Sequence, residues 1–127
     1  MPIDATRPYD DDNIFARILR GELPCTRIYE DEHVLAFQDI RPQAPVHLIV
    51  IPKGAYVSVD DFTAKASDAE QAALMRAIGK VARDAGVAKS GYRVLSNAGE
   101  HGHQEVPHLH FHIVGGRPLG RMLQKSD

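Results

Sequence analysis

Residues 107–116 read Pro-His-Leu-His-Phe-His-Ile-Val-Gly-Gly, and this stretch is the most informative part of the chain. In it three histidines alternate with three apolar residues, namely His108, His110 and His112 with Leu109, Phe111 and Ile113. Strict alternation is typical of a half-buried β-strand, because residues two apart point to the same face of a sheet. We therefore expect a strand whose apolar side chains meet the core while the three imidazoles line the opposite face.

Three imidazoles on one face are candidate catalytic groups, and a metal site is the alternative. Same-face neighbours lie roughly 6.6 Å apart along a strand, so His108 and His112 begin roughly 13 Å apart. Zinc holds its nitrogen ligands at about 2.0–2.1 Å, which two neighbouring histidines satisfy more easily than three. The spacing therefore favours catalysis over a metal site.

Length and composition indicate a single globular domain. The 127 residues are 43% hydrophobic and 25% charged, with a formal net charge of −2. This charge gives no electrostatic reason to expect a nucleic-acid or membrane partner. The single Cys25 cannot form an internal disulfide, and the acidic N-terminal stretch lacks a signal peptide's apolar centre. A cytoplasmic protein is the expectation.

The N-terminal third predicts a loose arm, a helix and a hairpin. Residues 1–12 carry two prolines and several aspartates without periodicity. Asp11 or Asp12 can cap a helix beginning near Asn13. The helix carries an apolar stripe and ends before Gly21; the stripe consists of Ile14, Phe15, Ile18 and Leu19. Residues 26–30 and 34–40 then predict two strands joined by a polar turn, a spacing that suits an antiparallel hairpin.

The remaining segments predict a buried strand and a long helix. Residues 46–52 form a nearly continuous apolar run, typical of a central strand covered on both faces. A connector follows, with one helical turn at residues 59–62. Ser67 and Glu70 form a capping-box pattern that opens a helix running to Gly86. Residues 92–96 then predict another short strand.

Further polar residues stand at the ends of these elements. His47 lies inside the apolar run and gains functional weight only if its strand lies beside the histidine strand. Asp39 ends the second strand and can form a turn or accept hydrogen bonds from a ribose diol. The loop at 99–106 contains two glycines, and with Asn97 and Gln104 it offers donors for an oxyanion.

The histidine stretch resembles the histidine triad motif, and the chain is similar to the HIT superfamily. Further matches are Phe37–Ile40, Pro42–Pro45, His47–Lys53 and Tyr92–Asn97, so that the resemblance spans nearly all of residues 13–119. Gly115 and Gly116, followed by Arg117, resemble the branch of purine nucleoside phosphoramidases.

The resemblance implies an α+β fold with a five-stranded antiparallel sheet and two helices. It also implies a homodimer in which the sheet continues from one subunit into the other. The expected domain organisation is a flexible arm at 1–12, a HIT domain at 13–119 and a C-terminal tail at 120–127.

The implied reaction is hydrolysis of a purine nucleoside 5′-phosphoramidate, with no cofactor or metal. By resemblance, His110 would attack the α-phosphorus and carry the nucleotide covalently. His112 would donate to the phosphate oxygens or the leaving group, supported by His108 and His47.

The resemblance also implies a nucleotide site. Asp39 would accept hydrogen bonds from the ribose hydroxyls. The loop side would meet the phosphate through Asn97, Gln104 and the Glu105 backbone, with His103 at the same loop. The purine would lie among apolar side chains, which are Ile14, Phe15, Ile18, Phe37 and Ile40.

Three features depart from the family pattern. His103 stands where glycine is frequent and adds bulk at the phosphate loop. Glu105 stands where the eukaryotic members carry a serine that helps to protonate the departing amine. The chain has no tryptophan, so a C-terminal tryptophan that would reach the partner subunit's site is missing.

Two alternatives remain open. The same histidine could serve a dinucleoside polyphosphate hydrolase or a nucleotidyl transferase. The chain could also be a nucleotide- or zinc-binding protein without catalysis, and the unusual His103 and Glu105 give this alternative its weight.

Overall fold

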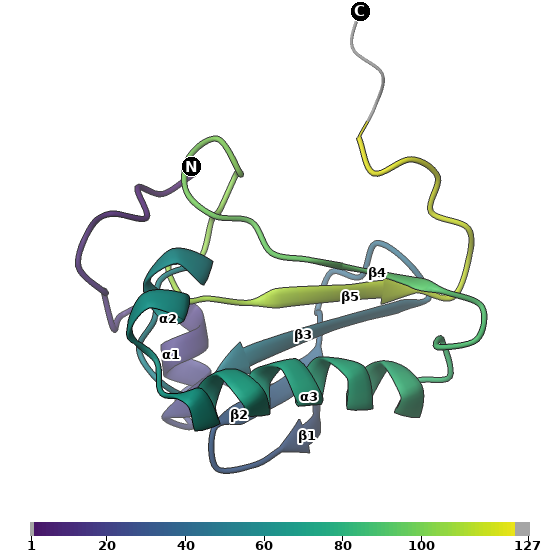
Figure 1. Cartoon of the computed structure of the whole chain (residues 1–127), viewed down its shortest axis with the longest axis horizontal. Helices are drawn as coiled ribbons and strands as arrows, with labels where there is room; N and C mark the ends of the chain where they lie inside the picture. Colours follow the sequence, from purple (N-terminus) through teal and green to yellow (C-terminus); the bar gives the residue numbers. More distant parts are fainter. Residues whose placement is uncertain (1, 124–127) are drawn as a thin grey trace, which may run out of the picture.

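The computed structural model describes residues 2–123 as one antiparallel sheet with helices on both faces (Figure 1). The sheet order is β1-β2-β3-β5-β4. The strands are β1 (Arg27–Glu30), β2 (Val34–Gln38), β3 (Val46–Pro52), β4 (Tyr92–Leu95) and β5 (Phe111–Gly115). The helices are α1 (Ile14–Leu19), α2 (Val59–Lys65) and α3 (Asp68–Asp84). The expected five-stranded antiparallel sheet is therefore confirmed.

The helix count differs from the expected two, because the predicted turn at 59–62 extends into α2. Ser58 caps this helix and forms a reciprocal capping box with Asp61. The two bonds satisfy backbone donors that a short helix end otherwise leaves free. None of the helices described between residues 2 and 123 has the length and apolar character needed to cross a bilayer.

The continuous apolar run of residues 46–52 forms β3, and both β2 and β3 are covered on both faces of the sheet. On one face, alternate residues such as Ala36 and Val50 pack against α3. On the other face, Leu35 and Ile49 pack against Phe15 of α1. Period-two alternation places His47 and His112 on the α1 face, because His112 pairs with Ile49 across β3 and β5.

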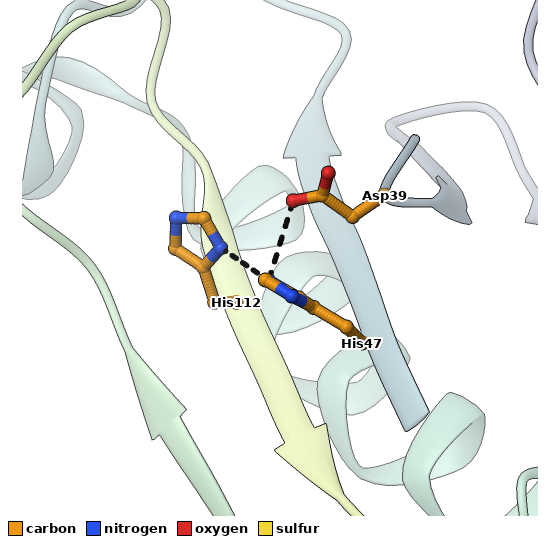
Figure 2. Close-up of side chains that lie close together, drawn as sticks. All are labelled: Asp39, His47 and His112. Carbon is orange, nitrogen blue, oxygen red and sulfur yellow. Dashed lines mark hydrogen bonds and ion pairs between the residues drawn. The ribbon is translucent and has the colours of Figure 1, made fainter. Parts of the chain in front are cut away.

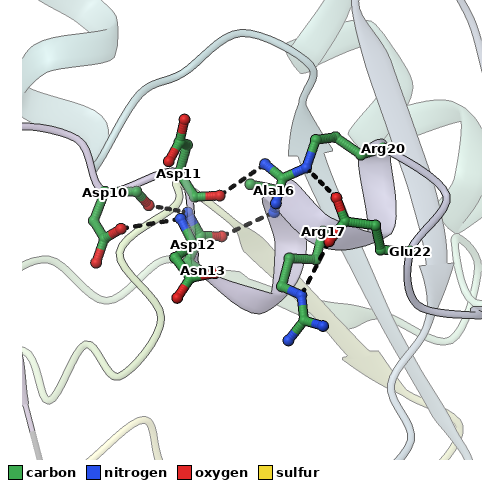
Figure 3. A network of polar contacts seen from close by, with 8 residues as sticks. All are labelled: Asp10, Asp11, Asp12, Asn13, Ala16, Arg17, Arg20 and Glu22. Atoms are coloured by element: carbon green, nitrogen blue, oxygen red, sulfur yellow. Dashed lines mark hydrogen bonds and ion pairs between the residues drawn. The ribbon is translucent and has the colours of Figure 1, made fainter.

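The start of α1 corrects the predicted cap. Asn13, rather than Asp11 or Asp12, is the N-cap, and its side chain accepts from the backbone N–H of Ala16 at 2.9 Å (Figure 3). The Asn13 amide also donates to the carbonyl of Asp10 at 2.7 Å. Asparagine performs both tasks because its amide has an acceptor and donors, whereas an aspartate carboxylate only accepts.

Strand β5 begins at Phe111, three residues later than the alternation predicts. Its ladder with β3 ends at the pair Val50 and Phe111. Further along β3 stands Pro52, which has no N–H to donate to the ladder. The N–H of Leu109 instead donates to the Tyr56 carbonyl at 2.8 Å. The alternation itself is confirmed, because Leu109, Phe111 and Ile113 pack on the α3 side.

The N-terminal arm runs beside the loop at 99–106 (Figure 1). The N–H of Ile3 donates to the carbonyl of Gln104 at 2.7 Å. Of the predicted C-terminal tail at 120–127, residues 124–127 lie outside the described part of the chain, as does Met1 at the other end.

Candidate functional site

The structure brings four histidines together on the α1 face of the sheet. His110 and His112 have ring centroids 5.1 Å apart, and His47 and His112 have centroids 5.2 Å apart. The ring of Phe15 lies edge-on against His110 at 4.9 Å and against His108 at 6.4 Å. Strand β3, which carries His47, is the neighbour of β5 in the sheet. This placement beside the histidine strand supports a functional role for His47.

The tautomer of His110 follows from its backbone partner. Its Nδ1 lies 2.8 Å from the carbonyl oxygen of His108, which can only accept. The neutral ring therefore carries its proton on Nδ1, and Nε2 keeps its lone pair. A ring nitrogen with a lone pair and a second nitrogen fixed by a hydrogen bond is the arrangement that a nucleophilic histidine needs.

His112 has the opposite tautomer, which follows from its hydrogen bond with His47; Figure 2 marks the contact between the two rings. The N–H of Gln43 donates to His47 Nδ1 at 3.0 Å, so the proton of the neutral His47 ring is on Nε2. That Nε2–H lies 2.9 Å from His112 Nδ1. His112 Nδ1 is thus the acceptor, and its Nε2–H is a donor. His110 therefore has the lone pair that a nucleophilic attack needs. Its neighbour His112 has an Nε2–H that can stabilise developing negative charge.

Burial favours the neutral form of the three histidines on the 108–112 stretch. It lowers the pKa of His108 to about 4 and that of His112 to about 4, the latter also through the neighbouring His110 and His47. Burial likewise lowers the pKa of His110, partly offset by the hydrogen bond to the His108 carbonyl. A neutral His110 is the form that can act as a nucleophile.

The carboxylate of Asp39 lies beside the rings of His47 and His112. One of its oxygens, Oδ2, is 3.3 Å from His47 Nε2, and the other accepts from the N–H of Arg41 at 2.8 Å. Asp39, His47 and His112 each offer one ligand atom within 4.8 Å of the others. Two imidazoles and a carboxylate suit zinc. The metal alternative considered for the histidine strand would therefore involve only one of its three histidines.

The predicted phosphate loop divides into a buried and an exposed part. Gln104 is only 1% exposed, and its amide donates to the carbonyls of Val57 and Val106. Both amide hydrogens are therefore used within the protein, and the contact of Gln104 with phosphate stays a prediction. Its Oε1 accepts from the N–H of Gly99 at 2.9 Å, which makes Gln104 the internal brace of the loop.

His103 and Glu105 are exposed and form an ion-pair geometry, with His103 Nε2 2.9 Å from Glu105 Oε1. His103 has a φ of +59°, a left-handed conformation that favours glycine. This explains in backbone terms why a glycine fits that position. Asn97 is half-buried and follows β4 on the side toward His110, because Leu95 pairs with His112.

The five predicted purine-binding residues do not share one environment. Phe15, Ile18 and Phe37 are buried in the cluster between α1 and the sheet. Ile14 is half exposed and Ile40 is 87% exposed. The first three thus pack in the core, and Ile14 and Ile40 are the members of the set with exposed surface.

Two further residues support the histidines and carry little signal in the sequence. The hydroxyl of Tyr9 lies 2.6 Å from His108 Nδ1, and Ser96 donates from its hydroxyl to the His110 carbonyl at 2.7 Å. Ser96 ends a predicted strand, which was a weak signal for its position. Tyr9 lies in an arm without periodicity, where no local pattern indicates a tertiary contact.

Comparison with known proteins places this geometry in a family. The profile described as HIT domain matches residues 20–119. An uncharacterized 13.2 kDa HIT-like protein of Azospirillum brasilense is 62% identical over 94% of this chain and 98% of its own length. The purine nucleoside phosphoramidase of Escherichia coli (strain K12) is 42% identical over 89% of this chain and 94% of its own length.

Solved structures agree with this assignment. A HIT family hydrolase from Clostridium thermocellum Cth-393 superimposes with a TM-score of 0.83 at 39% identity, covering 90% of this chain and 99% of its own. A histidine triad nucleotide-binding protein from Candida albicans gives a TM-score of 0.73 at 27% identity, covering 91% and 86%.

Proposed function

Because the chain belongs to the HIT domain family, we propose that it hydrolyses purine nucleoside 5′-phosphoramidates through a nucleotidyl intermediate on His110. The observation that carries this proposal is the ring of His110, whose Nδ1 is held by a carbonyl so that Nε2 retains a lone pair. The family membership supports nucleotide chemistry, and the relative named purine nucleoside phosphoramidase supports the P–N bond as the one that breaks.

The reaction has two displacements. In the first, His110 Nε2 attacks the α-phosphorus, a nitrogen–phosphorus bond forms, and the substrate's P–N bond breaks while the departing nitrogen takes up a proton from solvent and leaves as the amine. In the second, water attacks the same phosphorus and gives up a proton to solvent. The bond from phosphorus to His110 Nε2 then breaks, so that the nucleoside monophosphate leaves and the ring regains its lone pair. Dividing one difficult step into two is the general gain of covalent catalysis.

His112 and His47 would support the attack by His110. His112 presents Nε2–H to the phosphate oxygens or the leaving group, where negative charge develops. His47 fixes the tautomer of His112 by donating to its Nδ1. Neither step draws on a metal or a cofactor.

For the nucleotide, we propose that Asp39 accepts hydrogen bonds from the ribose hydroxyls and that Ile14 and Ile40 contact the purine. Asn97 and the Glu105 backbone N–H would contact the phosphate, while Gln104 braces their loop. His103 and Glu105, being exposed at that loop, would contact the leaving group rather than the nucleoside.

We also propose that the chain is a homodimer joined through β4. This strand is one edge of the described sheet, and its Tyr92 and Val94 are exposed. An open edge with exposed β-forming residues is a site where a second sheet can pair. The sheet would then continue from one subunit into the next.

The test is a substrate panel with wild type and His110→Ala. Wild type should cleave an adenosine 5′-phosphoramidate faster than diadenosine polyphosphates, and the variant should lose turnover by at least a thousandfold while binding adenosine monophosphate. His110→Gln guards against a cavity effect in the alanine variant, and His33→Ala, in the β1–β2 turn, is the matched histidine control. Wild-type turnover in His110→Ala would refute the proposal.

Mass spectrometry after an alkaline quench gives a second readout. The nucleotidyl group should appear on the peptide that contains His110 during turnover. Preferential cleavage of diadenosine polyphosphates would instead identify a dinucleoside polyphosphate hydrolase. Stoichiometric zinc in the purified protein, together with no turnover of either class of substrate, would favour the zinc-binding alternative.

A further inference from the structure

The N-terminal arm makes hydrogen bonds to the loop at 99–106 and to His108. Its Ile3 N–H donates to the Gln104 carbonyl at 2.7 Å, and Ala5 lies beside Gly99 of the same loop. Further along, the hydroxyl of Tyr9 reaches His108 Nδ1 at 2.6 Å, and the Tyr9 ring packs edge-on against the imidazole. These contacts join a segment without periodicity to the part of the chain that precedes β5.

The far end of the arm is anchored where α1 begins. Asn13 holds the Asp10 carbonyl, and Arg20 donates to the Asp11 carbonyl at 2.7 Å (Figure 3). Both bonds fix backbone atoms within two residues of Tyr9. The tyrosine therefore stands on a segment with restrained ends, rather than on a free terminus.

The direction of the Tyr9 bond follows from the other nitrogen of His108. That nitrogen, Nε2, lies 2.8 Å from the Pro52 carbonyl, which can only accept. The ring proton is on Nε2, so Nδ1 holds a lone pair and the Tyr9 hydroxyl donates to it. Burial raises the pKa of Tyr9, which keeps this donor protonated.

His108 has a second connection, through its backbone. Its carbonyl oxygen accepts the Nδ1–H of His110 at 2.8 Å and so selects the tautomer of that ring. The His108 side chain is completely buried and is bonded at both nitrogens, so the ring fixes where this backbone lies. Removal of the hydroxyl would leave a buried lone pair without its donor, which is costly.

We propose that Tyr9 is a positioning residue for the nucleophile: its hydroxyl holds the His108 ring, and through the His108 carbonyl it holds His110 in the reactive tautomer. The arm thus contributes to catalysis without touching substrate. This inference rests on the proposed function for its kinetic readout.

The experiment compares Tyr9→Phe with Tyr29→Phe in the full chain. Tyr29 is the matched control, because its hydroxyl makes an equally short bond of 2.6 Å, to Asp31 Oδ2 at the β1–β2 turn. Two quantities are measured: kcat and KM for the phosphoramidate, and the ring-nitrogen NMR resonances of His108 in the free protein. The second measurement needs no substrate, so it remains valid if the proposed reaction is wrong.

Tyr9→Phe should lower kcat about three- to tenfold with little change in KM, the size expected for one lost hydrogen bond. It should also shift the His108 Nδ1 resonance, whereas Tyr29→Phe should alter neither quantity. An unchanged kcat overturns the inference even if the resonance shifts, because the hydroxyl would then hold the ring without serving catalysis. A lowered kcat with an unchanged His108 resonance overturns it too, since Tyr9 would act by another route.

If wild type cleaves no phosphoramidate, the proposed function fails by itself. The NMR comparison then still decides whether the Tyr9 hydroxyl holds the His108 ring. An unchanged Nδ1 resonance in Tyr9→Phe would end that part of the inference as well.

Discussion

At the scale of single residues, backbone carbonyls determine the chemistry of the site. A carbonyl can only accept, so an imidazole nitrogen beside it must carry the proton. Two such contacts, to the carbonyls of Pro52 and His108, assign His108 and His110. The contrast between His110 and His112 arises because His47, a side chain, is the partner of His112. Identical residues thus acquire different roles from their neighbours.

The buried His108 predicts how stability depends on pH. Its pKa is about 4 in the folded protein and about 6.5 when unfolded, so the unfolded state binds the extra proton between these values. The free energy of unfolding should therefore fall as the pH drops from about 6.5 to about 4, by on the order of 3 kcal/mol from this group.

Urea denaturation at pH 7.5 and pH 4.5 checks this, with wild type compared against His108→Gln. The variant is less stable at pH 7.5, but its own decrease toward pH 4.5 should be smaller by that amount. Carboxylates titrate in both proteins, so the difference isolates the histidine. Parallel pH curves for the two proteins would contradict the prediction.

At the scale of elements, the loop at 99–106 is as important for the candidate site as β5. It is closed by backbone bonds from His103 to Glu100 and from Gln104 to Gly99. Gly102 lies inside it, where a Cβ would stand 2.5 Å from the Ala98 carbonyl oxygen. The loop can close this tightly only because that position has no side chain.

Gly102→Ala should therefore destabilise the protein by about 1–3 kcal/mol and lower its activity, because the backbone must shift to admit a methyl group. The matched control is Gly79→Ala in α3, where a Cβ would meet only the flexible end of Arg83. That variant should gain about 0.5–1 kcal/mol from helix propensity. Thermal unfolding of both variants measures the difference, and equal effects would refute this account of the loop.

At the scale of the whole molecule, the sheet separates two tasks. Its α3 face holds most of the core, while its α1 face holds the histidines beside Phe15. The edges of the described sheet are β1 and β4, and β4 adjoins β5. A partner that paired with β4 would lie one strand away from the site.

Val94→Asp should consequently convert a dimer into a monomer, because it places a charge on the exposed side of β4. Light scattering coupled to size-exclusion chromatography measures the mass. Ile28→Asp tests the other edge, and Met75→Asp is a control at an exposed apolar residue of α3. A monomeric wild type, or a dimer lost only in Ile28→Asp, would contradict the proposed interface.

Much of the fold could be predicted from local patterns. The boundaries of β3 were predicted to the residue, because its apolar run ends at a proline. The α3 helix began where its capping box indicated, since both partners of that box lie within four residues. The cap of α1 was assigned one or two residues early, because Asp11, Asp12 and Asn13 are all good caps and only the fold selects among them.

The sequence by itself determined the sheet, the face on which the histidines lie and the family, because period-two alternation and the triad spacing are local properties. Only the tertiary structure decided which nitrogen of each ring carries the proton, that Gln104 is a buried brace, and that Tyr9 reaches His108. Each of these depends on a partner that is distant in sequence: Pro52, Val57 and the arm lie 56, 47 and 99 residues from the groups they contact. No pattern along the chain reports such contacts, because they arise only when the chain folds back on itself.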